Sequence, residues 1–153
     1  LLCASRRGRS SLVQLLLSER AIDINAASPD GWNSLMLASH GRHPRTVEVL
    51  IKGGASVSDG GGGDKDLTPL HVAAKVGDIV ITTMLLRAGA NVKATCAQTG
   101  CTPLHLASFV GYLRIMKLLL QFGADVDSRI ANGGTALYIS AESGQLEAVK
   151  ILL

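Results

Sequence analysis

Apolar positions recur along this chain in two kinds of block that alternate. A short block with apolar third and fifth residues occupies 33–39, 68–74, 102–108 and 135–141. Successive starts of this block lie 35, 34 and 33 residues apart. A longer apolar stretch follows each short block, at 47–51, 79–86, 113–120 and 146–153. Within it, Ile115, Leu118 and Leu119 show the three- and four-residue spacing of a helix with one buried face. The pattern predicts a repeating unit of two short helices.

The residues between the blocks predict where each helix begins and ends. Thr68 and Thr102 occupy the N-cap position, and a proline follows each of them at the first helical position. A glycine follows each short block, at Gly41, Gly77, Gly111 and Gly144, and Gly77 and Gly111 end the helix with a residue that tolerates positive φ. The second helix is expected to end at the Gly-Ala pairs 54–55, 89–90 and 123–124. Polar, turn-rich segments then lead to the next unit.

One such unit cannot bury its apolar face alone, whereas stacked units can, so the expected fold is an all-α solenoid. The opening residues fit the same template without its first part, which gives five repeats in a single array. Their boundaries lie at about 1–29, 30–64, 65–98, 99–131 and 132–153. Since the first and last repeats are incomplete, we expect the chain to be an excerpt of a longer protein.

The sequence Thr-Pro-Leu-His at 68–71 and 102–105, the glycine between the helices and the Gly-Ala after the second helix resemble the ankyrin-repeat family. The resemblance covers nearly the whole chain. It implies antiparallel helix pairs that are joined by protruding hairpin loops and stacked into a slightly curved array. The second repeat departs from the pattern at Asn33, Ser34 and Met36, and Pro44 falls in the first turn of its second helix, where proline is tolerated. The loop 58–66 is longer than the family norm and rich in glycine, which predicts mobility.

Composition supports one folded domain and excludes several classes of protein. The 153 residues are 47% apolar and 18% charged, so they can form a core. With only 3% aromatic residues, that core must consist of Leu, Val, Ile and Ala. The net charge of +3 is too small to indicate a nucleic-acid-binding protein, and no apolar window is long enough for a membrane span. Three cysteines without a dense framework favour a reducing, intracellular setting, and we expect a cytoplasmic one.

No motif in the sequence predicts catalysis. The phosphate-binding loop, the serine-hydrolase elbow and the helical zinc-protease motif are absent, and the acidic residues are scattered. His71 and His105 are expected to pack beneath the hairpins and bond locally. Cys96, Cys101 and His105 are too few for a structural zinc site, and Cys3 falls on an inward position that predicts a small core residue. We therefore expect no enzyme activity, catalytic residue, cofactor, metal or small-molecule substrate.

The resemblance implies a concave groove formed by the first helices and the hairpin tips, with a protein or peptide as partner. By position, the contact residues are Arg6, Arg7, Trp32, His40, Lys65, Leu67, Lys75, Val76, Gln98, Cys101, Phe109, Val110, Asn132 and Glu142. This set is basic at the first end, apolar in the centre, and neutral to acidic at the last end. Trp32 and Phe109 are the expected anchors, since aromatic residues dominate binding energy. The alternative is that Trp32 folds over its own hairpin and Phe109 packs on a neighbouring helix.

The predicted function is that of a non-catalytic interaction module that binds a partner with an apolar centre and an acidic end near Arg6 and Arg7. Two other readings stay open. The chain could be a regulatory or substrate-recruiting segment of a larger enzyme, such as a kinase or a ubiquitin ligase. A weaker one is contact with anionic lipid or nucleic acid through the arginines at 6–9, which would weaken steeply with salt.

Overall fold

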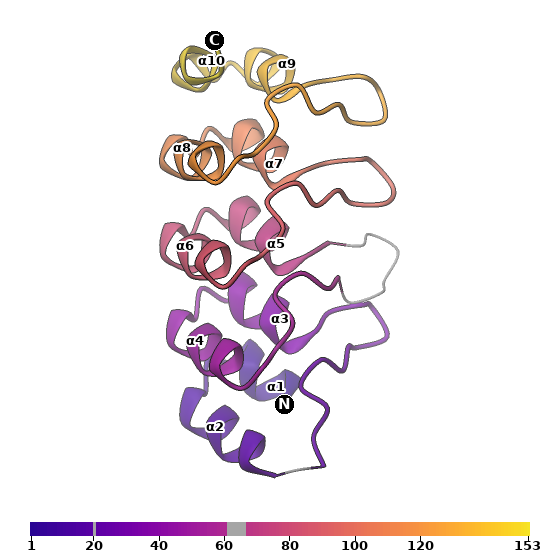
Figure 1. The fold of residues 1–153 in the computed structure, drawn as a ribbon, viewed down its shortest axis with the longest axis vertical. Coiled ribbons are helices and arrows are strands. Elements are labelled where there is room, and N and C mark those ends of the chain that lie inside the picture. Colours follow the sequence, from indigo (N-terminus) through magenta and orange to yellow (C-terminus); the bar gives the residue numbers. More distant parts are fainter. Residues whose placement is uncertain (20, 61–66) are drawn as a thin grey trace.

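The computed structural model describes residues 1–19, 21–60 and 67–153 (Figure 1). Within these residues the chain forms ten helices. They are α1 (Leu2–Arg6), α2 (Ser10–Ser18), α3 (Ser34–His40), α4 (Pro44–Lys52), α5 (Pro69–Val76), α6 (Ile79–Arg87), α7 (Pro103–Val110), α8 (Leu113–Gln121), α9 (Ala136–Glu142) and α10 (Leu146–Leu152). Among them, no helix has both the length and the apolar character needed to cross a bilayer.

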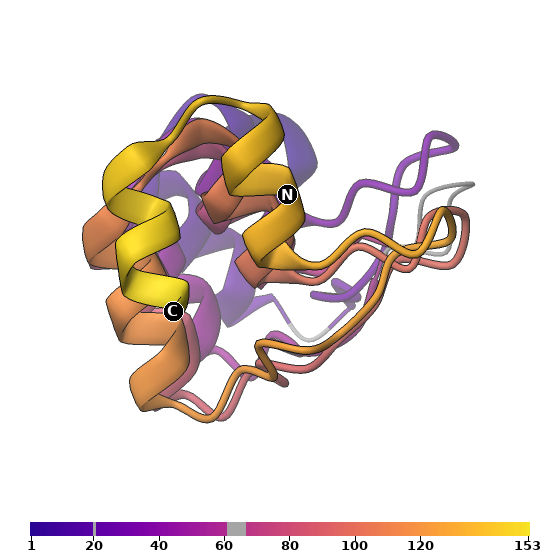
Figure 2. The same cartoon turned by 90° about the horizontal axis from the view of Figure 1, so that it is seen from above.

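The helices form antiparallel pairs that stack in chain order into an elongated array (Figure 1). The first helices α1, α3, α5, α7 and α9 contact one another in sequence and form one layer. The second helices α2, α4, α6, α8 and α10 form the other layer in the same way. Loops project from the side of the first helices, as the view along the array shows (Figure 2). This arrangement confirms the predicted all-α solenoid.

Reciprocal caps start α5 and α7 where the sequence predicts. The Thr68 side-chain oxygen accepts a hydrogen bond from the His71 amide at 3.4 Å, and the Thr68 amide donates to His71 Nδ1 at 3.2 Å. Thr102 and His105 form the same pair of bonds. In the second repeat, Asn33 Oδ1 accepts from the backbone amide three residues later at 2.9 Å. A hydroxyl or amide oxygen at this position therefore fixes the helix start in each of these repeats.

The turn between the two helices of the second repeat differs from the turns of the third and fourth repeats. Gly41 has a φ of −74°, and Arg42 adopts the positive φ, at +55°. Counted from the N-cap, Arg42 occupies the position of Gly77 and Gly111, both with φ of +81°. The left-handed conformation is costly for a residue with a Cβ atom. The Arg42 guanidinium donates a hydrogen bond to the Val76 carbonyl at the end of α5, and this contact with the next repeat helps to hold the conformation.

The core consists of aliphatic side chains that recur at the same place in each repeat. Leu35, Leu70 and Leu104 of the first helices are 0–1% exposed. Each such leucine stabilises the fold by about 1.5–3 kcal/mol relative to an exposed side chain. Ala73 and Ala107 are fully buried, and their small size lets neighbouring helices approach closely. Cys3, in contrast, is exposed, so its prediction as a core residue is wrong.

Candidate protein-binding face

The first helices and the loops that precede them form one side of the array, which we call the helix–hairpin face. At its N-terminal end, between α1, α3 and the hairpin 28–32, lies an open cleft of about 560 Å³. Its lining residues are Leu2, Cys3, Arg6, Ser28, Asp30, Trp32, Leu37, His40 and Gly41. Three residues predicted from the sequence, Arg6, Trp32 and His40, therefore meet in one cleft although they come from two repeats.

A tight hairpin positions Trp32. The Ser28 amide donates to the Trp32 carbonyl at 2.9 Å, and the Trp32 amide donates to Ser28 Oγ at 3.1 Å. Gly31, with φ of +76°, closes the turn. The Trp32 ring meets the His40 ring edge to face, with centroids 5.5 Å apart and an interplanar angle of 86°. Trp32 thus packs against His40 of its own repeat, and its half-buried ring also lines the cleft.

The C-terminal ends of the first helices place a row of predicted residues at equivalent positions. Arg6, His40, Lys75, Phe109 and Glu142 are each the last or the second-to-last residue of a first helix, and each is exposed. The Phe109 side chain is 64% exposed, so it is not packed on a neighbouring helix. The row changes along the array from cationic, through aromatic, to anionic.

The remaining predicted residues lie beside this row or on the loops. Arg7 caps α1, and the half-buried Val76 and the exposed Val110 end α5 and α7. On the loops, Gln98 and Asn132 are exposed, whereas Leu67 and Cys101 are half-buried. The structure does not bring these residues into the cleft. Lys65 lies outside the described residues, as does most of the loop 58–66 that was expected to be mobile.

Sequence reasoning missed part of the cleft wall. Cys3 and Leu37 line the cleft, and each lies three residues before a predicted contact, Arg6 and His40 respectively. Residues three apart on a helix share a face. The spacing alone was therefore a signal that these two side chains belong to the same surface as the predicted contacts.

His71 and His105 each bind the segment that leads to the next first helix. Nε2 of His71 lies 3.0 Å from the Cys101 carbonyl oxygen, and Nε2 of His105 lies 3.0 Å from the Ser128 carbonyl oxygen. Because Nδ1 accepts the bond from the N-cap amide, Nε2 carries the proton and donates. Burial lowers the pKa of both imidazoles, and the carbonyl contacts offset part of the shift. The two histidines thus bond within their own helix cap and also to the following loop.

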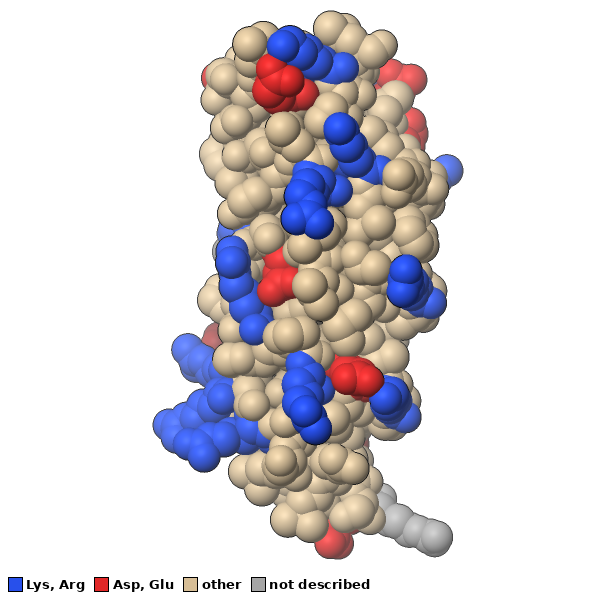
Figure 3. Space-filling model, turned by 90° about the vertical axis from the view of Figure 1, so that its left-hand side faces the viewer, with Lys and Arg blue, Asp and Glu red and all other residues tan. Residues whose placement is uncertain are grey.

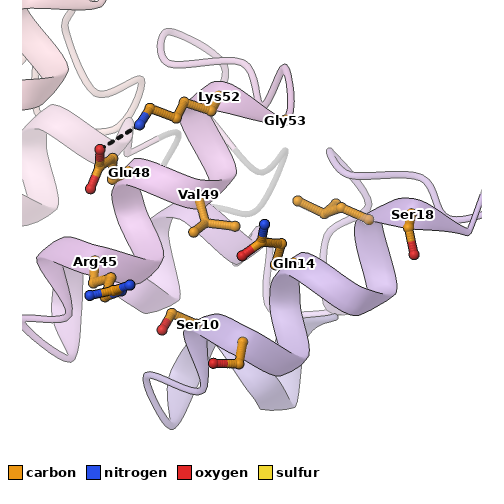
Figure 4. A pocket seen from close by; sticks show the side chains of 10 residues that line it. Ser10, Gln14, Ser18, Arg45, Glu48, Val49, Lys52 and Gly53 are labelled. Atoms are coloured by element: carbon orange, nitrogen blue, oxygen red, sulfur yellow. Dashed lines mark hydrogen bonds and ion pairs between the residues drawn. The ribbon is translucent and has the colours of Figure 1, made fainter.

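The opposite, second-helix side of the array has a second open cleft, of about 570 Å³, between α2 and α4 (Figure 4). Ser10, Gln14 and Arg45 contribute polar groups to it. Its carboxylate, Glu48, binds Lys52 at 2.6 Å, and that hydrogen bond is the main cause of the lowered pKa of Glu48. These groups suit hydrogen bonding, and the arrangement joins no nucleophile to a base.

Basic side chains are spread over this second-helix side and crowd toward its N-terminal end (Figure 3). The sequence places five arginines in the first two inter-helix turns and the helix ends beside them. They are Arg6, Arg7, Arg9, Arg42 and Arg45. The excess of positive over negative charge therefore lies within residues 1–52, up to the end of α4.

Stacked antiparallel helix pairs with projecting hairpins define the class of helical-repeat solenoids. The family model for ankyrin repeats, in three copies, matches residues 1–96 and 70–153, which together span the chain. The chain belongs to the ankyrin-repeat family. Such repeats are in general non-catalytic modules for protein–protein interaction. No curated protein matches the sequence in a direct comparison.

Proposed function

We propose that this chain binds a protein or peptide along its helix–hairpin face and performs no chemistry on it. The observation that carries the proposal is the cleft where Arg6, Trp32 and His40 meet. The row of helix ends continues from this cleft to the exposed ring of Phe109. Tryptophan and arginine are among the residues most enriched in binding hot spots, and a half-open pocket gives a partner side chain a place to be buried.

The order of side chains along the face suggests the chemistry of the partner. Arg6 and Arg7 suit an acidic segment, whereas Val76, Phe109 and Val110 suit an apolar one. From α1 to α7 there are three helix spacings of about 10 Å each, or about 30 Å. An extended peptide of about nine residues spans that distance at about 3.3 Å per residue. We propose such a segment, acidic at one end and apolar at its centre, as the bound element.

The test compares two phenylalanines on different sides of the array. Phe109 ends a first helix, whereas Phe122 caps the second helix α8, and both are exposed, at 64% and 42%. Wild type, Trp32→Ala, Phe109→Ala and Phe122→Ala would each be immobilised, and proteins captured from cell lysate would be quantified by mass spectrometry. A thermal-unfolding check would show that the four proteins are folded alike.

We expect a set of partners that wild type and Phe122→Ala retain and that Trp32→Ala and Phe109→Ala lose. Equal capture by all four proteins would refute binding on the helix–hairpin face. Loss in Phe122→Ala alone would place the partner on the second-helix side.

A further inference from the structure

The hairpin between the third and fourth repeats is closed by two cysteines that face each other. The Cys96 amide donates to the Cys101 carbonyl at 2.9 Å, and the Gly100 amide donates to the Cys96 carbonyl at 2.8 Å. Gly100 has a φ of +67°, as expected of a bulge residue next to a tight turn. Cys96 and Cys101 are therefore the opposed pair at the base of this hairpin.

This placement suits a disulfide. Opposed residues that exchange both backbone hydrogen bonds have Cα atoms about 5.5 Å apart, and Cys96 and Cys101 share one of these two bonds. Disulfides usually join Cα atoms about 4.4–6.8 Å apart. The corresponding closing pairs of two other hairpins are Ser28 with Trp32 and Ile130 with Gly134. The hairpin architecture thus brings these two positions together in several repeats, and in this one both are thiols.

The surroundings of the two thiols give them different roles. Cys96 is 6% exposed, and its Sγ lies 2.7 Å from the Thr99 hydroxyl oxygen. Burial raises the pKa of the Cys96 thiol, but hydrogen bonds with Thr99 and Cys101 together outweigh burial and leave that pKa lowered. Cys101 is half-exposed, so a reagent in solution reaches it more readily. Cys96 is placed to supply a thiolate, and Cys101 to meet a reagent.

We infer that Cys96 and Cys101 form a dithiol site that closes to a disulfide by exchange with a small disulfide such as oxidised glutathione. The Cys101 thiolate first attacks one sulfur of the small disulfide, forms a mixed disulfide and releases one thiolate. The Cys96 thiolate then attacks the Cys101 sulfur, forms the internal bond and releases the second thiolate. The two protons from the cysteines go to the released thiolates. The protein loses two electrons, and the small disulfide gains them.

Closure would act where the third repeat, the fourth repeat and the next hairpin meet. The Cys101 carbonyl accepts the bond from His71 Nε2 at 3.0 Å, and the Thr99 carbonyl accepts from the Ala131 amide of the next hairpin at 2.8 Å. A covalent bond at the base of the hairpin fixes the segment that carries both contacts. Oxidation is thus expected to stiffen the helix–hairpin face between the third and fifth repeats.

The chain provides its own control for a direct test. Trypsin cuts after Lys93 and Arg114, so both cysteines fall in the peptide 94–114, whereas Cys3 falls in the peptide 1–6. The full chain would be equilibrated in glutathione buffers of increasing oxidised fraction, quenched with acid, alkylated with N-ethylmaleimide and digested. We expect the peptide 94–114 to lose two hydrogen atoms and both alkylations together. Cys3, which is exposed and alone, should show only a glutathione adduct.

A peptide 94–114 that carries two glutathione adducts, or that stays fully alkylated while Cys3 is modified, would overturn the inference. Single variants test the order of steps. Cys96→Ser should trap a stable glutathione adduct at Cys101, whereas Cys101→Ser should leave Cys96 mostly unmodified under the same conditions. The reverse pattern would contradict the assigned order. Circular dichroism would show that both variants are folded.

Thr99 provides a last, independent check. Thr99→Val should slow closure of the disulfide several-fold because the hydroxyl no longer stabilises the Cys96 thiolate, and Thr99→Ser should restore the rate. The alkylation rate of Cys3 should be the same in all three proteins. If Thr99→Val forms the disulfide as fast as wild type does, the Thr99 hydroxyl does not assist the attack by Cys96.

Discussion

Two glycines with nearly the same φ but different surroundings allow a sharp test of the packing between repeats. Gly77 and Gly123 have φ of +81° and +86°. Alanine at either position adopts a left-handed conformation that costs about 1–2 kcal/mol. A Cβ atom at Gly77 would also overlap the ring of Tyr112, whereas nothing lies within 4 Å of one at Gly123. Moving that ring off its rotamer adds about 0.5–1.5 kcal/mol. Gly77→Ala should therefore cost about 1.5–3.5 kcal/mol, and Gly123→Ala only about 1–2 kcal/mol.

The assay is urea unfolding followed by circular dichroism, with the free energy of unfolding compared at equal slope. The two glycine variants would also be made in a Tyr112→Ala background. There the difference between them should disappear, because the group that the new Cβ atom meets is gone. Equal destabilisation by Gly77→Ala and Gly123→Ala in the native background would refute the described contact between the third and fourth repeats.

Three further predictions concern the turn, the buried histidines and the core. Arg42→Ala should be less stable than wild type because it keeps the left-handed backbone and loses the bond to the carbonyl at the end of α5. Arg42→Gly should match wild type, since relief of about 1 kcal/mol of backbone strain offsets the lost hydrogen bond. The urea midpoints of the two variants and of wild type test this order. Acidification from about pH 7 to about pH 5 should destabilise wild type. The pKa values of His71 and His105 in the folded protein lie below the unfolded value of about 6.5. The stability that the two neutral imidazoles contribute is therefore fully present above the unfolded pKa and is lost as the pH falls toward the folded pKa. A double His→Gln variant should show a weaker pH dependence of its urea midpoint, and an unchanged one would contradict this cause. Leu50→Ala, at a 0% exposed position, should cost about 2–5 kcal/mol in the same assay. Leu12→Ala, at a 45% exposed position, should cost less, and an equal loss would contradict the described core.

The sequence predicts the regular parts of this fold well because their signals are local. A threonine, a proline and a histidine within four residues are enough to specify a capped helix start, and the structure confirms it at Thr68 and Thr102. The turn at Arg42 follows an equally local rule, because the positive φ falls nine residues after the N-cap, as it does at Gly77 and Gly111. Gly41 stands one position before that, so the positive φ falls on Arg42 and not on the glycine.

The candidate site depends on contacts that cross from repeat to repeat. Trp32 is 26 residues from Arg6 in the sequence, and only the stacking of α1 on α3 brings them to one cleft. Helical periodicity places Cys3 on the inward face of its helix, but it does not determine how far the neighbouring hairpin covers the side chain. The structure leaves the side chain exposed at the cleft wall.

The two histidine bonds give the array a direction. Each imidazole caps its own helix and also binds a carbonyl in the segment that leads to the next first helix, so these bonds tie a first helix to its successor and not to its predecessor. Truncation from the two ends should then be unequal. Removing the residues after 126 takes away the Ser128 acceptor and leaves a buried donor on His105, whereas removing the first two repeats leaves both histidine bonds intact. In a solenoid each unit contacts only its neighbours. This polarity would make folding proceed toward the C-terminus and would make the C-terminal end the first to unfold.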